Sequence, residues 1–394
     1  MRRREFLVLG AAATGTFLLG GWGQFRRPAA TAAQRSIPTV DQLILTNVVD
    51  NVYDIFARGG RLRDVTVQRT PLPYPTGSAP MLLAEHGLAY HLESVRGQER
   101  REILLDFALT SSTLTNNYAA LTVDPAQADA LILSHGHSDH YGGLPDLVGA
   151  APQGLTNHHA PASPAAEARP LRLPRGLTLY AGGEDTFCHR WVVTPDGQRL
   201  DYGQLDRGAL EAQGVRIVLA KEPTVVAGHA ITSGQIPRLT AFESPPASAR
   251  LEAGPPGSAC AATLHFPPGT VQAEVAPGEL VQDFFWGEHA TAYHVKDRGL
   301  VVISSCGHAG IINSIWQLQK VTGIERLHAV VGGWHLAPAP DEIVARTVEA
   351  LKELDPDYLI PMHCTGANTI AALQRELPDK LILPSTGTRI VFGA

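Results

Sequence analysis

The sequence is poor in cysteine, in aromatic residues and in charge, and each shortage excludes a class of protein. Of its 394 residues, 6% are aromatic, 18% are charged and four are cysteine. Four widely spaced cysteines are too few for a disulfide framework, and we do not expect a bridge, although one pair is an alternative. The net charge of −6 and the lack of a basic stripe with interleaved aromatic residues argue against nucleic acid as a partner. The hydrophobic content of 44% is typical of a globular protein.

The amino-terminal segment resembles a twin-arginine export signal. Arg3-Arg4-Glu5-Phe6-Leu7 precedes an apolar run to about Gly21, and the small residues Ala30-Thr31-Ala32 follow. We therefore expect residues 1–33 to be a signal peptide for the twin-arginine export machinery, and the mature protein to be periplasmic or extracellular. An uncleaved membrane anchor and a chance basic start are the alternatives, but roughly 15 apolar residues are short for crossing a bilayer.

The strongest functional signal is a run of potential metal ligands, His135-Gly-His-Ser-Asp-His140. It follows an apolar stretch, residues 128–134, that is typical of a buried strand, and active sites of open α/β sheets usually lie beyond such strand ends. His135 and His137 differ by two positions, so in extended backbone they point the same way and can hold one ion. Asp139 and His140 are offset and can serve a second ion. Imidazole and carboxylate donors suit zinc, iron or manganese in a catalytic site.

The carboxyl-terminal third alternates between strands and helices. Strands are predicted at 299–306, 327–331 and 358–361, and helices at 311–321 and 341–354. Earlier in the chain, strands are predicted at 43–56, 87–94 and 101–107, before a helix or loop at 111–120. The β-α-β units of the last third require a parallel sheet with helices on one face. A histidine follows each of their strands, so His308, His335 and His363 are predicted to lie at one edge of that sheet.

The run at 135–140 and the strand ends of the carboxyl-terminal third together supply enough ligands for two divalent metal ions. The predicted ligands are His135, His137 and His308 for the first ion and Asp139, His140 and His363 for the second. A metal-bound hydroxide is the expected nucleophile, oriented by Asp139, with zinc as the expected metal and iron or manganese as alternatives. His335 is predicted to donate a proton to the leaving group or to contact substrate. Cys306 and Cys364 flank predicted ligands and are interpreted as small buried residues.

Five short motifs together resemble the metallo-β-lactamase superfamily, whose main motif has the order His-x-His-x-Asp-His seen at 135–140. The motifs are Ser134–Gly143, Thr232–Arg238, Cys306–Ile311, Gly332–Leu336 and His363–Gly366. They are similar to one branch, that of the methanopterin-pathway dihydropteroate synthase, also named ribofuranosylaminobenzene phosphate synthase-like metallo-hydrolases. The resemblance implies an α/β fold, the four-layer αββα metallo-β-lactamase sandwich, over residues 40–394. It also implies that Arg238 and Glu243 lie near the substrate.

The sequence departs from the superfamily at one strand end. Many members carry a Gly-Asp turn whose aspartate bridges both ions, whereas the corresponding turn here reads Ser305-Cys306-Gly307-His308. Either His308 replaces a usual ligand or the second ion is held weakly. His229 and His289 are reserve ligands, although a surface or structural role is the simpler interpretation of each.

Two stretches interrupt the predicted domain. Residues 150–170 are rich in alanine and proline without sustained periodicity, and His158 and His159 in this loop are interpreted as exposed. Residues 244–278 contain seven prolines and are predicted to be irregular. An irregular stretch of this length is often functional, so it is a candidate cover for the site.

Three functions are compatible with these features. The preferred one is an exported metal-dependent hydrolase acting on a small-molecule ester, such as a phosphoester or a lactone. The second is a pterin-forming transferase like the named member of the branch, which export argues against because its substrates are cytosolic. The third is a non-catalytic metal-binding or sensory module on the same fold. The ligands set the type of reaction but leave the substrate open.

Overall fold

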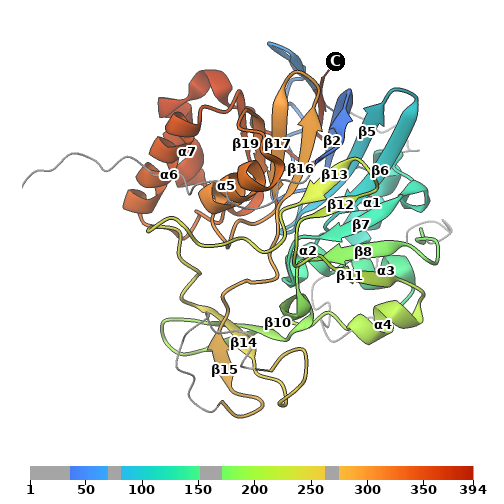
Figure 1. The fold of residues 1–394 in the computed structure, drawn as a ribbon, viewed down its shortest axis with the longest axis vertical. Helices are drawn as coiled ribbons and strands as arrows, with labels where there is room; N and C mark the ends of the chain where they lie inside the picture. The colour runs from blue at the N-terminus through green and yellow to red at the C-terminus, as the bar shows by residue number, and fades with distance from the viewer. Residues whose placement is uncertain (1–35, 70–80, 151–170, 262–274, 394) are drawn as a thin grey trace, which may run out of the picture. The chain divides into compact units, whose positions relative to one another are not determined.

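Two β-sheets pack face to face in the computed structural model, which describes residues 36–69, 81–150, 171–261 and 275–393 (Figure 1). The predicted signal peptide lies outside these residues, as do His158 and His159 in the loop at 151–170. Within the described ranges, no helix is long and apolar enough to cross a membrane.

The first sheet has nine strands within the described residues. In spatial order they are β11 (Arg216–Leu219), β8 (Thr178–Ala181), β7 (Ala130–Leu133), β6 (Glu99–Leu105), β5 (Ala89–Arg96), β2 (Gln42–Val49), β20 (Arg389–Phe392), β4 (Val65–Gln68) and β3 (Gly60–Leu62). The four strands from β11 to β6 are parallel, and the others pair antiparallel.

The second sheet has seven strands in the same part of the chain. Its order is β12 (Thr224–Val226), β13 (Ala230–Thr232), β16 (Thr291–Val295), β17 (Gly299–Ser304), β18 (Leu327–Gly332) and β19 (Tyr358–Pro361), with β1 (Thr39–Val40) beside β16. β17, β18 and β19 are parallel to one another, as the β-α-β pattern predicted.

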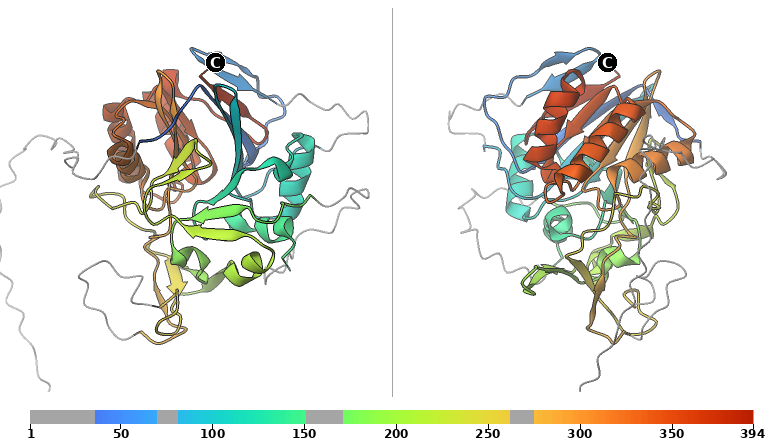
Figure 2. Two further views of the ribbon diagram at one scale, coloured as in Figure 1. Left: turned by 45° about the vertical axis from the view of Figure 1, so that its right-hand side comes forward. Right: turned by 90° about the vertical axis from the view of Figure 1, so that its left-hand side faces the viewer.

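Helices cover the outer face of each sheet (Figure 2). On the nine-stranded sheet lie α1 (Ser111–Ala120), α3 (Leu144–Val148) and α4 (Arg207–Ala212), and on the seven-stranded sheet lie α5 (Ile311–Thr322), α6 (Asp341–Leu354) and α7 (Ala367–Glu376). The predicted four-layer αββα sandwich is therefore confirmed. α6 and β19 have the predicted bounds, and α1 is a helix over the predicted residues.

The burial of β7 shows why its sequence is apolar at every position. Ile132 packs into the core between the two sheets, where Val301 and Ile303 of β17 also lie. Leu131 and Leu133 point to the other face and pack in a second core with residues of α1 and α3. A strand buried on both faces reads as a continuous hydrophobic run.

Two expectations from the sequence were wrong. Cys188 and Cys260 form a disulfide, across a separation of 72 residues that gave no sign of pairing. The segment 244–278, expected to be irregular, contains strand β14 (Ala249–Glu252) of a small sheet ordered β10 (Arg199–Gly203), β9 (Arg190–Val193), β14 and β15 (Leu280–Gln282). β14 alternates buried Ala249 and Leu251 with half-buried residues, but surrounding prolines masked so short a pattern.

Candidate metal centre

The predicted metal loop begins where β7 ends. The chain bends at His135–Gly136 and then forms the one-turn helix α2 (Ser138–Tyr141), which carries Asp139 and His140. The bend requires glycine, because a Cβ atom at Gly136 would collide with the carbonyl oxygen of Thr186. The spacing of His135 and His137 suggested a fully extended backbone between them. In the structure the backbone is bent there, and close packing around Gly136 positions the two side chains.

Three parallel strands bring the other predicted residues to the same place. Ser304 of β17 pairs with Gly332 of β18, which pairs with Pro361 of β19, so the strands end together. The turns that follow hold His308, His335 and His363 at one sheet edge, as predicted. His335 and His363 have left-handed backbone, with φ of 47° and 51°. Such strain in residues other than glycine is concentrated at functional sites.

His135, His137 and His308 form a first group of potential ligands. Ring centroids lie 4.7 Å apart for His135 and His137, 4.9 Å for His135 and His308, and 4.8 Å for His137 and His308. Nε2 of His135 and both ring nitrogens of His308 are buried without a hydrogen-bond partner among the described residues. Because an unpaired buried nitrogen is costly, these atoms point to a missing ligand such as a metal ion.

Asp139, His140 and His363 form a second group beside the first. Oδ2 of Asp139 lies 3.3 Å from Nε2 of His363 and 3.6 Å from Nε2 of His140. Both of these Nε2 atoms and Oδ1 of Asp139 are buried without a hydrogen-bond partner in the described part of the chain. The His140 ring lies 4.3 Å from that of His135, so the two groups adjoin. The structure thus brings together all six predicted metal ligands.

The two groups together form the metal-ligand cluster. Hydrogen bonds from neighbouring residues orient the imidazole rings of this cluster. Asp106 accepts a hydrogen bond of 2.7 Å from Nδ1 of His140 and two of 2.8 Å from the backbone and side chain of Ser134. Oδ1 of Asn51 accepts one of 3.1 Å from Nδ1 of His363. With Nδ1 occupied in this way, Nε2 of each ring faces the cluster and is free to bind metal.

The electrostatics of the two groups differ. Burial lowers the pKa of His135, His137 and His308 well below the ordinary value, which keeps each imidazole neutral as metal binding requires. Burial also opposes charging of His140, but Asp139 and Asp106 together raise the pKa of His140 to about 9. The second group therefore favours a positive charge, which a metal ion can supply in place of a proton.

Replacing Asp106 by asparagine is expected to weaken metal binding by about 10- to 100-fold, because the His140 ring loses the carboxylate that orients it. Competition with a chromophoric chelator measures the affinity. Asp146→Asn is the matched control, since Asp146 accepts from Ser111 outside the cluster. An unchanged affinity in Asp106→Asn would show that the ring is held by packing alone.

His335 lies next to the first group and is only half-buried. Its ring centroid is 4.1 Å from that of His308, and its Nδ1 is 3.7 Å from Sγ of Cys306. Its backbone N–H donates to Sγ of Cys364 at 3.2 Å. This places His335 beside the cluster, where its predicted role as proton donor or substrate contact stays a prediction.

Arg238 and Glu243 have main-chain partners that the sequence did not predict. Arg238 donates to the carbonyl oxygen of His308 at 2.9 Å, and burial lowers the pKa of its guanidinium. Glu243 accepts from the backbone N–H of Ile312 at 2.8 Å and of Asn313 at 2.9 Å, at the start of α5. Burial raises the pKa of Glu243 to about 7. Both side chains hold the His308 turn and α5, and their contact with substrate stays a prediction.

The two reserve histidines are buried outside the cluster. Nε2 of His289 bonds the carbonyl oxygen of Leu133 at 2.8 Å, and Nδ1 of His229 bonds Oγ of Ser94 at 2.8 Å. Each therefore has a hydrogen bond that fits the structural interpretation, and neither replaces one of the six clustered ligands.

The sequence did not lead us to His86, which lies beside the metal-ligand cluster. His86 has a largely exposed side chain whose ring stacks on His363 at 5.1 Å, and its Nε2 lies 3.5 Å from Oδ2 of Asp139. It precedes β5, so a search of strand ends gave no reason to select it. No local pattern in the sequence separates His86 from an ordinary exposed histidine.

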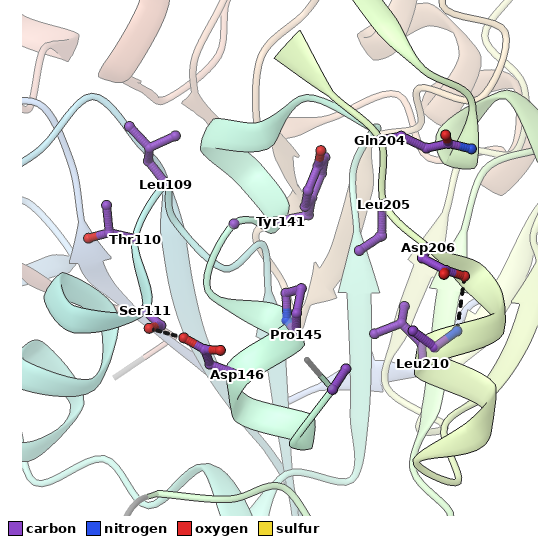
Figure 3. A pocket seen from close by; sticks show the side chains of 13 residues that line it. Leu109, Thr110, Ser111, Tyr141, Pro145, Asp146, Gln204, Leu205, Asp206 and Leu210 are labelled. Atoms are coloured by element: carbon purple, nitrogen blue, oxygen red, sulfur yellow. Dashed lines mark hydrogen bonds between the residues drawn. The ribbon is translucent and has the colours of Figure 1, made fainter. Parts of the chain in front are cut away.

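A separate pocket lies near the metal loop (Figure 3). Leu109, Tyr141, Pro145 and Leu210 are among the residues that line it, and none of the clustered histidines does. Tyr141 belongs to α2, so the pocket adjoins the loop without opening onto the predicted ligands.

Comparisons with known proteins identify the family and agree with the fold. A model of the metallo-beta-lactamase superfamily matches residues 95–363. The chain is 26% identical over 313 residues to the 7,8-dihydropterin-6-methyl-4-(beta-D-ribofuranosyl)-aminobenzene-5'-phosphate synthase of Methanocaldococcus jannaschii, covering 78% of this chain and 90% of that protein. Among solved structures, Tm1679, a metal-dependent hydrolase of the β-lactamase superfamily, is similar with a TM-score of 0.57 and 19% identity, covering 88% of this chain and 98% of that one.

Proposed function

This chain belongs to the metallo-β-lactamase superfamily, whose members bind divalent metal ions, and we propose that it is a metal-dependent hydrolase of small-molecule esters. One observation carries the proposal. Ring nitrogens of four neighbouring histidines are buried without hydrogen-bond partners among the described residues, namely those of His135, His140, His308 and His363. A phosphoester or a lactone is the proposed class of substrate.

The proposed ligands follow the two groups. His135, His137 and His308 hold one ion, and Asp139, His140 and His363 hold the other. Zinc is the proposed metal, because neutral imidazoles with one carboxylate suit it, and iron and manganese are the alternatives.

When bound, two such ions lower the pKa of water and stabilise negative charge on the attacking and leaving oxygens. The residues of the chain supply the rest of the proposed chemistry. Asp139 is buried, and although burial opposes its ionisation, His140 and His363 hold its pKa well below the usual range. It therefore stays a carboxylate that can accept a hydrogen bond and orient the nucleophile. We propose that His335, whose ring centroid lies 4.1 Å from that of His308, gives a proton to the leaving group.

We also propose that the protein is exported by the twin-arginine route. The disulfide between Cys188 and Cys260 supports this, because disulfides persist mainly in oxidising compartments. Changing Arg3 and Arg4 to lysine should retain the protein in the cytoplasm, as fractionation and blotting would show. Unchanged appearance outside the cytoplasm would contradict the twin-arginine route.

A second candidate function is a pterin-forming transferase. The similarity to the synthase of Methanocaldococcus jannaschii favours it, at 26% identity over most of both chains. In that reaction an aromatic amine would displace pyrophosphate from a pterin. It requires an amine acceptor, whereas the hydrolase requires only water, so a comparison of products separates the two.

The deciding experiment combines metal counting with a substrate screen. The mature protein is loaded with zinc, iron or manganese and assayed on phosphoesters, lactones, β-lactams, thioesters, and a pterin pyrophosphate with an aromatic amine. We expect two ions per chain and ester turnover that is lost in His137→Ala. His189→Ala is the matched control, since that histidine pairs with Asp201 and Glu252 outside the cluster. Bound metal without any turnover would favour a binding or sensory module.

A further inference from the structure

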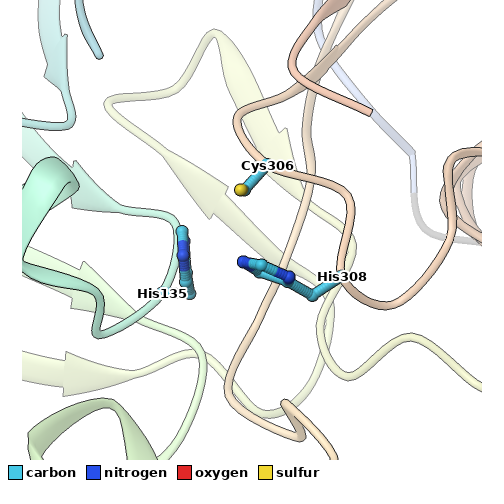
Figure 4. Close-up of side chains that lie close together, drawn as sticks. All are labelled: His135, Cys306 and His308. Carbon is cyan, nitrogen blue, oxygen red and sulfur yellow. The ribbon is translucent and has the colours of Figure 1, made fainter. Parts of the chain in front are cut away.

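The sulfur of Cys306 lies close to two histidines of each group of potential ligands. It lies with nitrogens of His135 and His308 in one set, and with nitrogens of His140 and His363 in another. Within each set, all ligand atoms lie within 4.8 Å of one another. Figure 4 shows the sulfur directed toward the space between the rings of His135 and His308. In the described part of the chain, no other residue belongs to both sets.

Close packing around Cys306 holds the sulfur in this position. Cys306 is buried in the turn after β17, and the next residue, Gly307, has φ of 75°. A Cβ at Gly307 would lie 3.1 Å from the Cα of Trp334, so the turn packs closely against the one after β18. The sulfur of Cys306 itself contacts Sγ of Cys364 at 3.2 Å and Nδ1 of His335 at 3.7 Å, so the buried side chain has little room to turn away from the histidines.

We propose that Cys306, as a thiolate, bridges the two metal ions. This inference rests on the proposed dinuclear centre and assigns the ligand that joins its halves. Thiolate sulfur binds zinc at about 2.3 Å and is also a ligand for iron. The five clustered histidines are neutral ligands, and Asp139 is the only carboxylate among the predicted ones. A thiolate between the ions adds a second negative charge where it offsets their mutual repulsion, and its proton leaves to solvent on binding.

Cys364 is the competing thiol, and its contacts differ. Its Sγ lies 3.2 Å from that of Cys306. It accepts the backbone N–H of His335 at 3.2 Å and donates to the carbonyl oxygen of Cys306 at 3.3 Å. Among the described residues, Cys364 comes within ligand distance only together with Cys306 and His335, and with neither pair of predicted histidine ligands. The two cysteines therefore form a matched pair, one proposed ligand and one support.

Cobalt substitution tests the assignment independently of activity. In protein loaded with two Co²⁺ ions, the Cys306 thiolate should give sulfur-to-cobalt charge-transfer absorption in the near ultraviolet. This absorption should persist in Cys364→Ser and disappear in Cys306→Ser, which should also hold its second ion at least about tenfold more weakly. Cys306→Asp should recover tight binding of two ions without the absorption. Absorption that survives in Cys306→Ser but is lost in Cys364→Ser would overturn the proposal.

X-ray absorption of the zinc-loaded wild-type protein needs no variant and distinguishes a bridge from a terminal ligand. A bridging thiolate gives about one sulfur neighbour per ion at about 2.3 Å, whereas a terminal one gives about half of that. Two bound ions without a sulfur neighbour would overturn the role of Cys306 and leave the dinuclear hydrolase standing. Fewer than one ion per chain would overturn both.

Discussion

Replacing His308 by leucine should abolish activity without destabilising the metal-free protein. Both nitrogens of His308 are buried without a hydrogen-bond partner among the described residues, and its ring stacks on Phe285 at a centroid distance of 4.1 Å. An unpaired buried polar group costs about 1–3 kcal/mol, and an apolar side chain of similar volume avoids that cost. The loss of a predicted ligand should nevertheless lower kcat/KM at least about a thousandfold, because the first ion loses one of its three protein ligands.

Urea unfolding of metal-free protein measures the first effect, and steady-state kinetics of the zinc-loaded protein measures the second. His289→Leu is the matched control. His289 is also buried, but its Nε2 bonds the carbonyl oxygen of Leu133. Its removal should therefore destabilise the metal-free protein, by about 1–3 kcal/mol. If His308→Leu destabilises that protein as much as His289→Leu does, His308 has a structural role and the unpaired nitrogens do not indicate a metal ligand.

The sequence predicts the parallel part of the fold well because two periodicities alternate there without interruption. α6 has an amphipathic pattern over 14 residues, and it ends at Leu354, before Asp355 in left-handed backbone. β19 is an apolar run of four residues buried on both faces. The small sheet around β14 was not predicted, because strands of three to five residues joined by proline-rich turns lack a period long enough to detect.

The site was predictable to the extent that its ligands follow strands. His135, His308 and His363 each stand just beyond an apolar run, so the sequence indicates that they meet. The same rule could have selected Asp106, which follows β6 directly and accepts from His140. Cys306 was interpreted as a small buried residue, because its proximity to two histidine pairs depends on how the two sheets pack. No local pattern carries that information.

Loss of Arg190 should cost several kcal/mol of stability, about 3–5 kcal/mol, because its charge is paired in the interior. Arg190 lies at the start of β9 and is 1% exposed, and its Nε donates to Oδ2 of Asp283 at 2.9 Å. Its NH1 donates to the carbonyl oxygens of Gly136 and Thr186, each at 3.3 Å, so the guanidinium also supports the metal loop. Removing one partner of a buried ion pair leaves an uncompensated charge and costs about 3–5 kcal/mol. We expect this loss in Arg190→Met, measured by urea unfolding of the metal-free protein.

A double-variant cycle separates the charge from the packing. Asp283→Asn keeps a side-chain acceptor for the backbone N–H of Phe285 but removes the negative charge. Combined with Arg190→Met, it should recover part of the lost stability, because the unpaired negative charge of Asp283 is removed, whereas Asp185, 3.7 Å from Arg190 in the wild-type protein, is unchanged. Metal affinity should stay low in the double variant, since Gly136 still lacks the donor that holds its carbonyl oxygen. Recovery of metal affinity together with stability would mean that Arg190 acts on the loop only through Asp283, and not through its own hydrogen bond to Gly136.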